Sequence, residues 1–168
     1  KTDALITDEP GLPLLLCFAD CTPILLLDPA HRAVGIAHGG WKGTVRRIAA
    51  KTVLRMQREF GTRPEDVLAA IGPSIGPCCY EVGPEVERQF QEAFSGHEAA
   101  LFSHPDAVGG THLSLWAANR LQLEEIGVLR EHIDEARTCT ACHHEDFFSY
   151  RADGGQTGRL GAVIALRS

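Results

Sequence analysis

Residues 19–43 carry the sequence ADCTPILLLDPAHRAVGIAHGGWKG. Within it, two short apolar runs, residues 24–27 and 33–37, flank a break that contains a proline. Such a pair of runs around a turn is typical of a β-hairpin. Because an antiparallel hairpin returns the chain to the edge from which it started, we expect Cys21 and His38 to lie side by side. The stretch therefore predicts a strand pair with a thiol and an imidazole at one end.

A thiol and an imidazole held together are either metal ligands or a nucleophile with its base. The alternative is an inert buried cysteine beside a histidine, which is the common case for cysteines in general. Here Gly39, Gly40 and Gly43 follow the histidine directly and open a predicted helix. Glycines leave the backbone N–H groups bare, so an anion or a polar substrate can approach them. We therefore interpret this end of the hairpin as a candidate site.

Longer blocks of sequence extend this pattern along the chain. They read ADCTPILLLDP, AHGGWKGT, IGPSIGPCCYEVG, RTC, FFSYR and TGR, in that order. Together they resemble the YfiH-type laccase-domain family over residues 2–166. That family has been labelled polyphenol oxidase and later purine nucleoside phosphorylase and deaminase, and related bacterial members are linked to editing of peptidoglycan precursors. The resemblance implies layered mixed sheets flanked by helices, related to a cysteine-hydrolase-like fold.

The resemblance also implies roles for two residues of the hairpin. The family has a cysteine in its ADC block and a histidine in its AHxGW block as metal or catalytic residues, and these match Cys21 and His38. Its third ligand is a histidine upstream of a segment that matches residues 2–7. We therefore expect residues 1–168 to be a single domain that lacks its N-terminal portion and with it the third ligand.

Composition places the chain among ordinary globular proteins. It has 168 residues, of which 44% are hydrophobic and 23% charged, enough for one domain with a real core. The net charge of −6 argues against a nucleic-acid surface. No apolar run approaches the roughly 20 residues of a membrane span, and no secretory core is visible at the start. Six cysteines without an export signal predict reduced thiols, and the family resemblance implies a cytoplasmic enzyme.

Periodicity predicts a mixture of hairpin strands and three helices. Strict alternation of strands and helices is absent, so we predict an α+β, or mixed α/β, fold. The predicted strands outside the hairpin span residues 4–7, 14–18, 67–71, 147–151 and 160–166, and the predicted helices span residues 41–60, 84–96 and 114–126.

Substrate-binding candidates follow from the resemblance and from local sequence. Phosphate for phosphorolysis would be held by Lys42 and by the backbone around Gly40. The stiff Gly/Pro loop at residues 72–77, which contains Ser74, suits a pocket wall.

Two arginines flank the turn that precedes the last predicted strand. Arg151 and Arg159 are either solvated rim charges or ligands of an anion such as phosphate.

A second set of cysteines needs a separate interpretation. Cys139, Cys142 and His143 form a C-x-x-C-H pattern, which suits zinc or c-type haem. Haem would require export and an axial partner, neither of which is visible. A small zinc site is an alternative, although two thiols at a strand–loop junction are the leading interpretation. We interpret the adjacent pair Cys78 and Cys79 as buried packing or loop lining.

Three functional hypotheses result. In the first, Cys21 and His38 hold Zn²⁺ (or copper) in an enzyme that phosphorolyses adenosine, inosine, guanosine or methylthioadenosine and deaminates adenosine. A multi-copper oxidase fits poorly, because too few ligands are present and thiolate with imidazole suits zinc at least as well. In the second, Cys21 is a metal-free nucleophile that acts on an amide with His38 as base. In the third, Cys139, Cys142 and His143 stabilise a zinc-dependent binding module.

Overall fold

Five strands form the central sheet of the computed structural model, which describes residues 2–104 and 109–167. Their order is β1 (Ala4–Thr7), β4 (Ala33–Gly39), β3 (Thr22–Asp28), β5 (Leu68–Ile71) and β9 (Ile133–Glu135). All neighbours are antiparallel except β5 and β9, which are parallel. The predicted hairpin is β3 and β4, paired so that Thr22 lies opposite Gly39 and Pro23 opposite His38. The mixed α+β class is confirmed.

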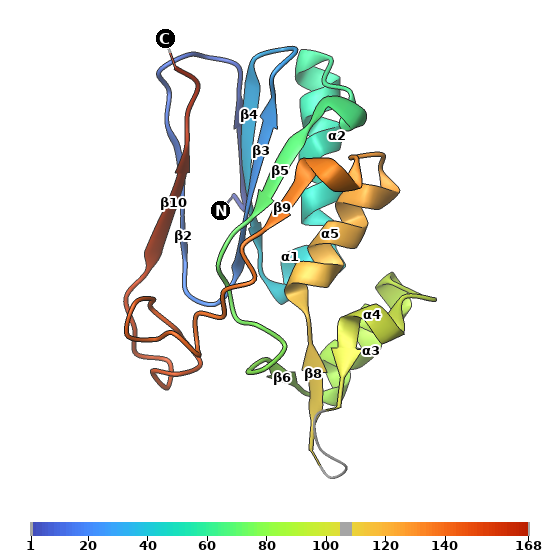
Figure 1. Cartoon of the computed structure of the whole chain (residues 1–168), viewed down its shortest axis with the longest axis vertical. Coiled ribbons are helices and arrows are strands. Elements are labelled where there is room, and N and C mark those ends of the chain that lie inside the picture. Colours follow the sequence, from blue (N-terminus) through green and yellow to red (C-terminus); the bar gives the residue numbers. More distant parts are fainter. Residues whose placement is uncertain (1, 105–108, 168) are drawn as a thin grey trace.

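The two faces of the sheet are covered differently (Figure 1). Helices α1 (Trp41–Val45), α2 (Ile48–Phe60) and α5 (Leu115–Glu125) lie on one face. The pair β2 (Leu14–Phe18) and β10 (Leu160–Ile164) lies on the other. Because side chains alternate along a strand, Ile24 and Leu26 pack toward the helices while Leu25 and Leu27 pack toward β2 and β10. Burial on both faces explains why β3 is a continuous apolar run.

The remaining elements form a smaller layer beside α5 (Figure 1). A second sheet has the order β6 (Glu81–Val82), β8 (Thr111–Leu113) and β7 (Phe102–Ser103). This sheet lies with α3 (Pro84–Ala93) and α4 (Glu98–Leu101). Outside this layer, two short 3₁₀ turns span Pro64–Asp66 and Arg130–His132, each shortly before a strand of the central sheet. Within the described residues, no helix is both long and apolar enough to cross a membrane.

Two predicted helices agree closely with the structure. Helix α3 begins at Pro84 as expected and ends at Ala93, three residues before Gly96. Helix α5 is capped by the Ser114 side chain, which accepts a hydrogen bond from the Ala117 N–H at 3.2 Å.

The predicted continuous helix over residues 41–60 is wrong, because the chain breaks between α1 and α2. Arg47 adopts a left-handed conformation with φ of 65°. In a continuous helix the Thr44 carbonyl would accept the N–H of Ile48. Instead it accepts the Arg47 N–H at 2.9 Å and the side-chain amide of Gln122 at 2.9 Å. A buried contact from α5 therefore overrides the local helical pattern.

The predicted strand at residues 147–151 is also wrong, since residue 147 lies in a bend, residues 148–149 have no regular structure and residues 150–151 lie in a turn. Its polar groups are used locally and across the site. The Ala152 N–H donates to the Ser149 hydroxyl at 3.1 Å, and the Arg151 N–H donates to the Asp20 carboxylate at 2.7 Å. An alternating sequence predicts a strand only when a neighbouring strand is available to accept these N–H groups.

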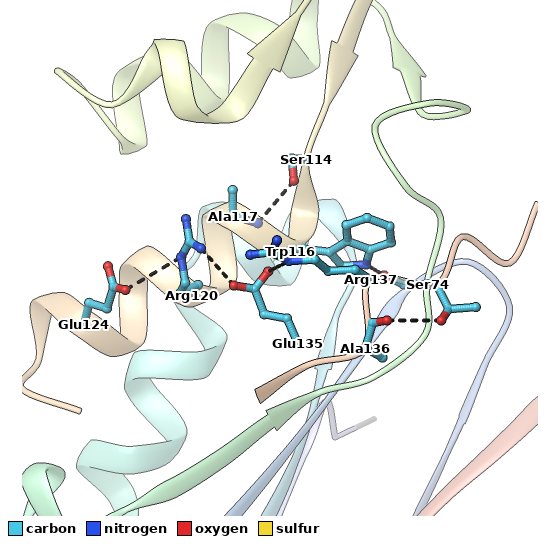
Figure 2. A network of polar contacts seen from close by, with 10 residues as sticks. Ser74, Ser114, Trp116, Ala117, Arg120, Glu124, Glu135, Ala136 and Arg137 are labelled. Atoms are coloured by element: carbon cyan, nitrogen blue, oxygen red, sulfur yellow. Dashed lines mark hydrogen bonds and ion pairs between the residues drawn. The ribbon is translucent and has the colours of Figure 1, made fainter. Parts of the chain in front are cut away.

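A network of ion pairs fastens α5 to the end of β9 (Figure 2). Arg120 donates to Glu135 at 2.9 Å and lies 3.7 Å from Glu124, and Arg137 reaches the same Glu135 at 3.3 Å. The network orients the chain that leaves β9 and continues toward residue 139.

Buried amides fasten α1 to α5. The Asn119 side chain donates to the Thr44 hydroxyl at 3.2 Å and to the Leu115 carbonyl at 2.9 Å, and all of its side chain is buried. Substitution Asn119→Ala leaves the Thr44 hydroxyl short of a partner, which costs about 1–3 kcal/mol. We therefore expect the free energy of unfolding, measured in urea, to fall by roughly that amount.

The exposed amide of Gln91 on α3 is the matched control, since it donates only to Glu87 one turn away. We expect Gln91→Ala to change stability by less than about 0.5 kcal/mol. Equal losses in the two variants would contradict the role assigned to the buried network.

Candidate functional site

Antiparallel pairing brings Cys21 and His38 to the same end of the β3–β4 hairpin, as predicted. Cys21 immediately precedes β3 and His38 lies opposite Pro23. The imidazole stacks on the Phe18 ring with 4.8 Å between centroids, which fixes its orientation. A Cβ at Gly40 would lie 2.9 Å from the Cys21 sulfur and 3.7 Å from His38 Nε2. Any side chain at position 40 would therefore enter the space between the thiol and the imidazole.

Two cavities share this pair of side chains. One, of about 350 Å³, is lined by Cys21 and His38 together with Cys17, Ala19, Asp20, Ile75, Tyr80, Tyr150, Arg151 and Arg159. The other, of about 300 Å³, is lined by the same pair together with Asp3, Gly40, Trp41, Lys42 and Gly43. Both volumes lie at the lower end of the range for small-molecule sites. The thiol and imidazole therefore stand where two separate compartments meet.

The three basic side chains that we predicted as substrate ligands line these cavities. Lys42 lies in the smaller one, with its ammonium 5.2 Å from the centroid of the Trp41 ring. Arg151 and Arg159 lie in the larger one. The Arg151 guanidinium donates to the carbonyls of Cys79 at 3.1 Å and Glu81 at 3.0 Å, so it fastens the cavity wall. Arg159 uses one terminal nitrogen, Nη1, to bond the carbonyls of the turn at residues 157–158.

Ser74, which the sequence suggested as a substrate ligand, lines neither cavity. Its side chain is fully buried, and its hydroxyl accepts from the Trp116 indole N–H at 2.6 Å and from the Thr22 hydroxyl at 3.0 Å (Figure 2). Ser74 thus supports the loop at residues 72–77 from beneath. Ile75, its neighbour in that loop, lines the larger cavity.

The electrostatic surroundings of Cys21 favour a cation. Burial, followed by the negative charges of Asp20 and Asp3, raises the pKa of the Cys21 thiol, and the Arg159 guanidinium only partly opposes this. Thiolate, imidazole and carboxylate are the donor types that zinc accepts. Cys21, His38 and Asp3 all line the smaller cavity, so donors of the types that could hold a metal ion meet there.

Asp20 is the site residue that sequence reasoning missed. It has φ of 75°, a left-handed conformation that aspartate tolerates better than most residues. Its carboxylate accepts from the Thr140 hydroxyl at 2.7 Å and from the Arg151 N–H at 2.7 Å, and its carbonyl accepts the Ile75 N–H at 3.0 Å. The available signal was its place directly before Cys21.

Two further cavity residues were not anticipated. Tyr80 forms part of the wall, and burial together with the nearby Cys21 raises its pKa to about 12. Its hydroxyl is therefore neutral and can donate a hydrogen bond at physiological pH. Asp3 supplies a carboxylate to the smaller cavity from the chain just before β1.

The second set of cysteines is arranged differently from the prediction. Cys139 and Cys142 gather with Cys78 and Cys79, whereas His143 lies in a separate exposed group with acidic residues. Cys78 is exposed, so buried packing is wrong for it, whereas the alternative of loop lining agrees with its place in the loop that follows β5.

Comparison with known proteins identifies close relatives. The family model described as multi-copper polyphenol oxidoreductase laccase matches residues 1–167. A purine nucleoside phosphorylase of Bacteroides thetaiotaomicron is 46% identical over 165 residues, which are 98% of this chain and 60% of the relative. An adenosine deaminase, RL5, from an unknown prokaryotic organism is 41% identical over 157 residues, which are 94% of this chain and 59% of the relative.

Comparison with a solved structure shows similarity to the same group of proteins. The crystal structure of YlmD from Geobacillus stearothermophilus superposes with a TM-score of 0.93 at 41% identity and covers 100% of this chain and 62% of that one. The chain spans about 60% of the length of the curated relatives from Bacteroides thetaiotaomicron and Geobacillus stearothermophilus.

The Asp20 carboxylate generates a testable prediction. Substitution Asp20→Ala removes an ionised acceptor from the Thr140 hydroxyl and the Arg151 N–H, and a hydrogen bond to a charged group contributes about 1.5–3 kcal/mol. We expect hydrogen exchange at the Arg151 amide to accelerate by at least about tenfold, because its partner is lost. The exposed Asp8, substituted by alanine, is the control and should leave this exchange rate unchanged. Unaltered exchange in Asp20→Ala would contradict the assignment.

Proposed function

The chain belongs to the multi-copper polyphenol oxidoreductase laccase family, and from this premise we propose that it forms much of the active site of a purine nucleoside phosphorylase that also deaminates adenosine. Its substrates are adenosine, inosine, guanosine and methylthioadenosine. The names of the relatives support this choice. The observation that carries it is the Cys21 and His38 pair at the junction of two cavities. In phosphorolysis, nucleoside and phosphate must approach one reacting carbon together. Two cavities that meet at one point could hold one substrate each.

The larger cavity suits the nucleoside. Tyr80 and Tyr150 present aromatic surface on which a purine can stack. The neutral Tyr80 hydroxyl can donate to a ring nitrogen or a ribose oxygen. Asp20 cannot donate in the same way, because a carboxylate only accepts hydrogen bonds, and its oxygens already accept from Thr140 and Arg151.

The smaller cavity suits phosphate. Lys42 supplies a positive charge, and Gly40 and Gly43 leave the backbone uncovered. In phosphorolysis a phosphate oxygen bonds to the ribose anomeric carbon as the bond from that carbon to the purine nitrogen breaks. The purine leaves with the electron pair and takes up a proton. Lys42 orients the phosphate and offsets its charge, and Arg159 offers a second positive charge from the other side.

Cys21 and His38 would hold the metal, with zinc the first candidate and copper the second. Asp3 lies in the same cavity and can supply a further oxygen ligand. When bound, such an ion supplies Lewis acidity that activates water for deamination. Phe18 keeps the imidazole in its coordinating orientation by stacking against it.

Removal of either member of the pair tests the site. In full-length protein we expect Cys21→Ala and His38→Ala each to lower adenosine turnover by at least about a hundredfold, because each loses a ligand that touches the reacting centre. The exposed His104, substituted by alanine, should retain the wild-type rate. Near-normal turnover in either site variant, measured by chromatography of the released base, would exclude the assignment.

Alkylation of Cys21 distinguishes a metal-dependent enzyme from a metal-free cysteine hydrolase. If Cys21 holds a metal, iodoacetamide should label it only after treatment with a chelator. Equal labelling with and without chelator, in an enzyme that stays active without metal, would favour the nucleophile hypothesis.

Lys42 tests the assignment of the phosphate cavity. We expect Lys42→Ala to raise the KM for phosphate by about tenfold or more, the worth of one charge-assisted hydrogen bond, while deamination changes less than about twofold. The exposed Lys51 on α2, substituted by alanine, controls for loss of a surface charge and should leave both reactions unchanged. Equal losses in phosphorolysis and deamination would contradict a phosphate role for Lys42.

A further inference from the structure

Four of the six cysteines converge on one point outside the candidate active site. Cys78 and Cys79 lie in the loop that follows β5, and Cys139 and Cys142 lie in the segment that follows β9. Their sulfur atoms all lie within 4.8 Å of one another. The Cys142 sulfur is 3.5 Å from that of Cys78 and 3.4 Å from that of Cys79.

We propose that these four cysteines form a structural zinc site that is separate from the Cys21 and His38 pair. Zinc binds four thiolates tetrahedrally with Zn–S bonds of about 2.3 Å, which places the sulfurs about 3.8 Å apart. The observed separations, from 3.4 Å up to a limit of 4.8 Å, bracket that spacing. Four protein ligands leave no open position, so the site is structural and not catalytic. The inference does not depend on the proposed enzymatic function.

The fold brings these cysteines together through parallel pairing. Ile71 of β5 lies opposite Glu135 of β9, so both strands leave the sheet at the same end. The two segments then stay together: the Ser74 N–H donates to the Thr138 carbonyl at 3.2 Å, and the Thr140 N–H donates to the Ser74 carbonyl at 3.1 Å. Backbone pairing therefore brings cysteines about 60 residues apart to one point.

The backbone around Gly76 is shaped to the sulfurs. Its N–H donates to the Cys139 sulfur at 3.2 Å, the kind of outer contact that orients a thiolate ligand. A Cβ at this position would lie 2.7 Å from the Trp116 ring and 3.2 Å from both the Cys139 Cβ and the Cys78 sulfur. Glycine thus allows the loop to approach the cluster closely. The fold therefore places the loop and the four sulfur atoms close together.

A disulfide explains the cluster less well than a metal. Cys142 is nearly equidistant from Cys78 and Cys79, so no single partner is selected. One disulfide would also leave two thiols beside it, with Cys139 buried against the Gly76 N–H. A tetrahedral ion uses all four sulfurs at once.

The site would stiffen one wall of the larger cavity. The carbonyl of Cys79 accepts from Arg151, and the next residue, Tyr80, lines the cavity with its ring 5.6 Å from the Arg151 guanidinium. A bound ion would fasten the loop at residues 72–80 to the segment at residues 139–151. Zinc would therefore preserve the shape of the cavity without touching what binds there.

Metal content and spectroscopy of the full-length protein test this proposal. Protein prepared anaerobically, with reductant and without a histidine tag, is loaded with zinc or cobalt and analysed as wild type, Cys21→Ser, Cys142→Ser and His143→Ala. We expect Cys142→Ser to lose one equivalent of zinc that Cys21→Ser and His143→Ala both retain. Cobalt-loaded Cys21→Ser should show strong thiolate-to-cobalt absorption, and a chelator should lower its melting temperature. Both effects should disappear when Cys142→Ser is added.

A measurement on an intact cluster covers the case in which Cys142→Ser does not fold. X-ray absorption at the zinc edge of Cys21→Ser protein should give four sulfur neighbours at about 2.3 Å. Fewer than four sulfurs, loss of the equivalent in His143→Ala, or a disulfide involving Cys142 in the anaerobic protein would each overturn the proposal. Unchanged zinc content in a folded Cys142→Ser variant would do so as well.

Discussion

The antiparallel register of β3 and β4 is the constraint on which the candidate site depends. It sets Thr22 opposite Gly39 and Pro23 opposite His38, and so holds Cys21, the residue before β3, close to His38. A slip of one residue would turn every side chain of the strand to the other face. Ile24 and Leu26 would then leave the helical layer, which makes a slip costly because these side chains are fully buried. The apolar core thus fixes the position of Cys21 relative to His38.

Asp20 links the β3–β4 hairpin to the other segments that form the larger cavity. Its carboxylate reaches two segments far away in the sequence, at Thr140 and Arg151, and its carbonyl holds the loop at Ile75. The parallel pair β5 and β9 delivers both of those segments to the same end of the sheet. The carboxylate and the backbone carbonyl of this one residue therefore join the hairpin to the segment and the loop that form the opposite wall. Its left-handed backbone aims the carboxylate inward.

Local patterns predicted the features that depend on nearby residues. The hairpin and the Ser114 cap are encoded within a few positions of where they occur, and both were recovered. The break between α1 and α2 depends on Gln122, almost eighty residues away, and the irregular course of residues 147–151 depends on Asp20. Sequence periodicity contains no information about such distant partners. The same limit explains why Ser74 was interpreted as a pocket residue although its hydroxyl is used beneath the loop.

Acidic and basic side chains lie close together around Cys21 in the candidate site. The chain as a whole carries a net charge of −6, which would repel phosphate from an average part of its surface. Asp3 and Asp20 add negative charge beside Cys21, whereas Lys42 and Arg159 place positive charge around the same point. A divalent cation held at Cys21 would offset the negative charge of the thiolate and of the nearby carboxylates, so that Lys42 and Arg159 could act on an incoming anion. Without it, the same carboxylates would oppose phosphate binding. The proposed metal and the proposed phosphate site are therefore coupled electrostatically, because the cation that stabilises the Cys21 thiolate also makes the smaller cavity suitable for an anion.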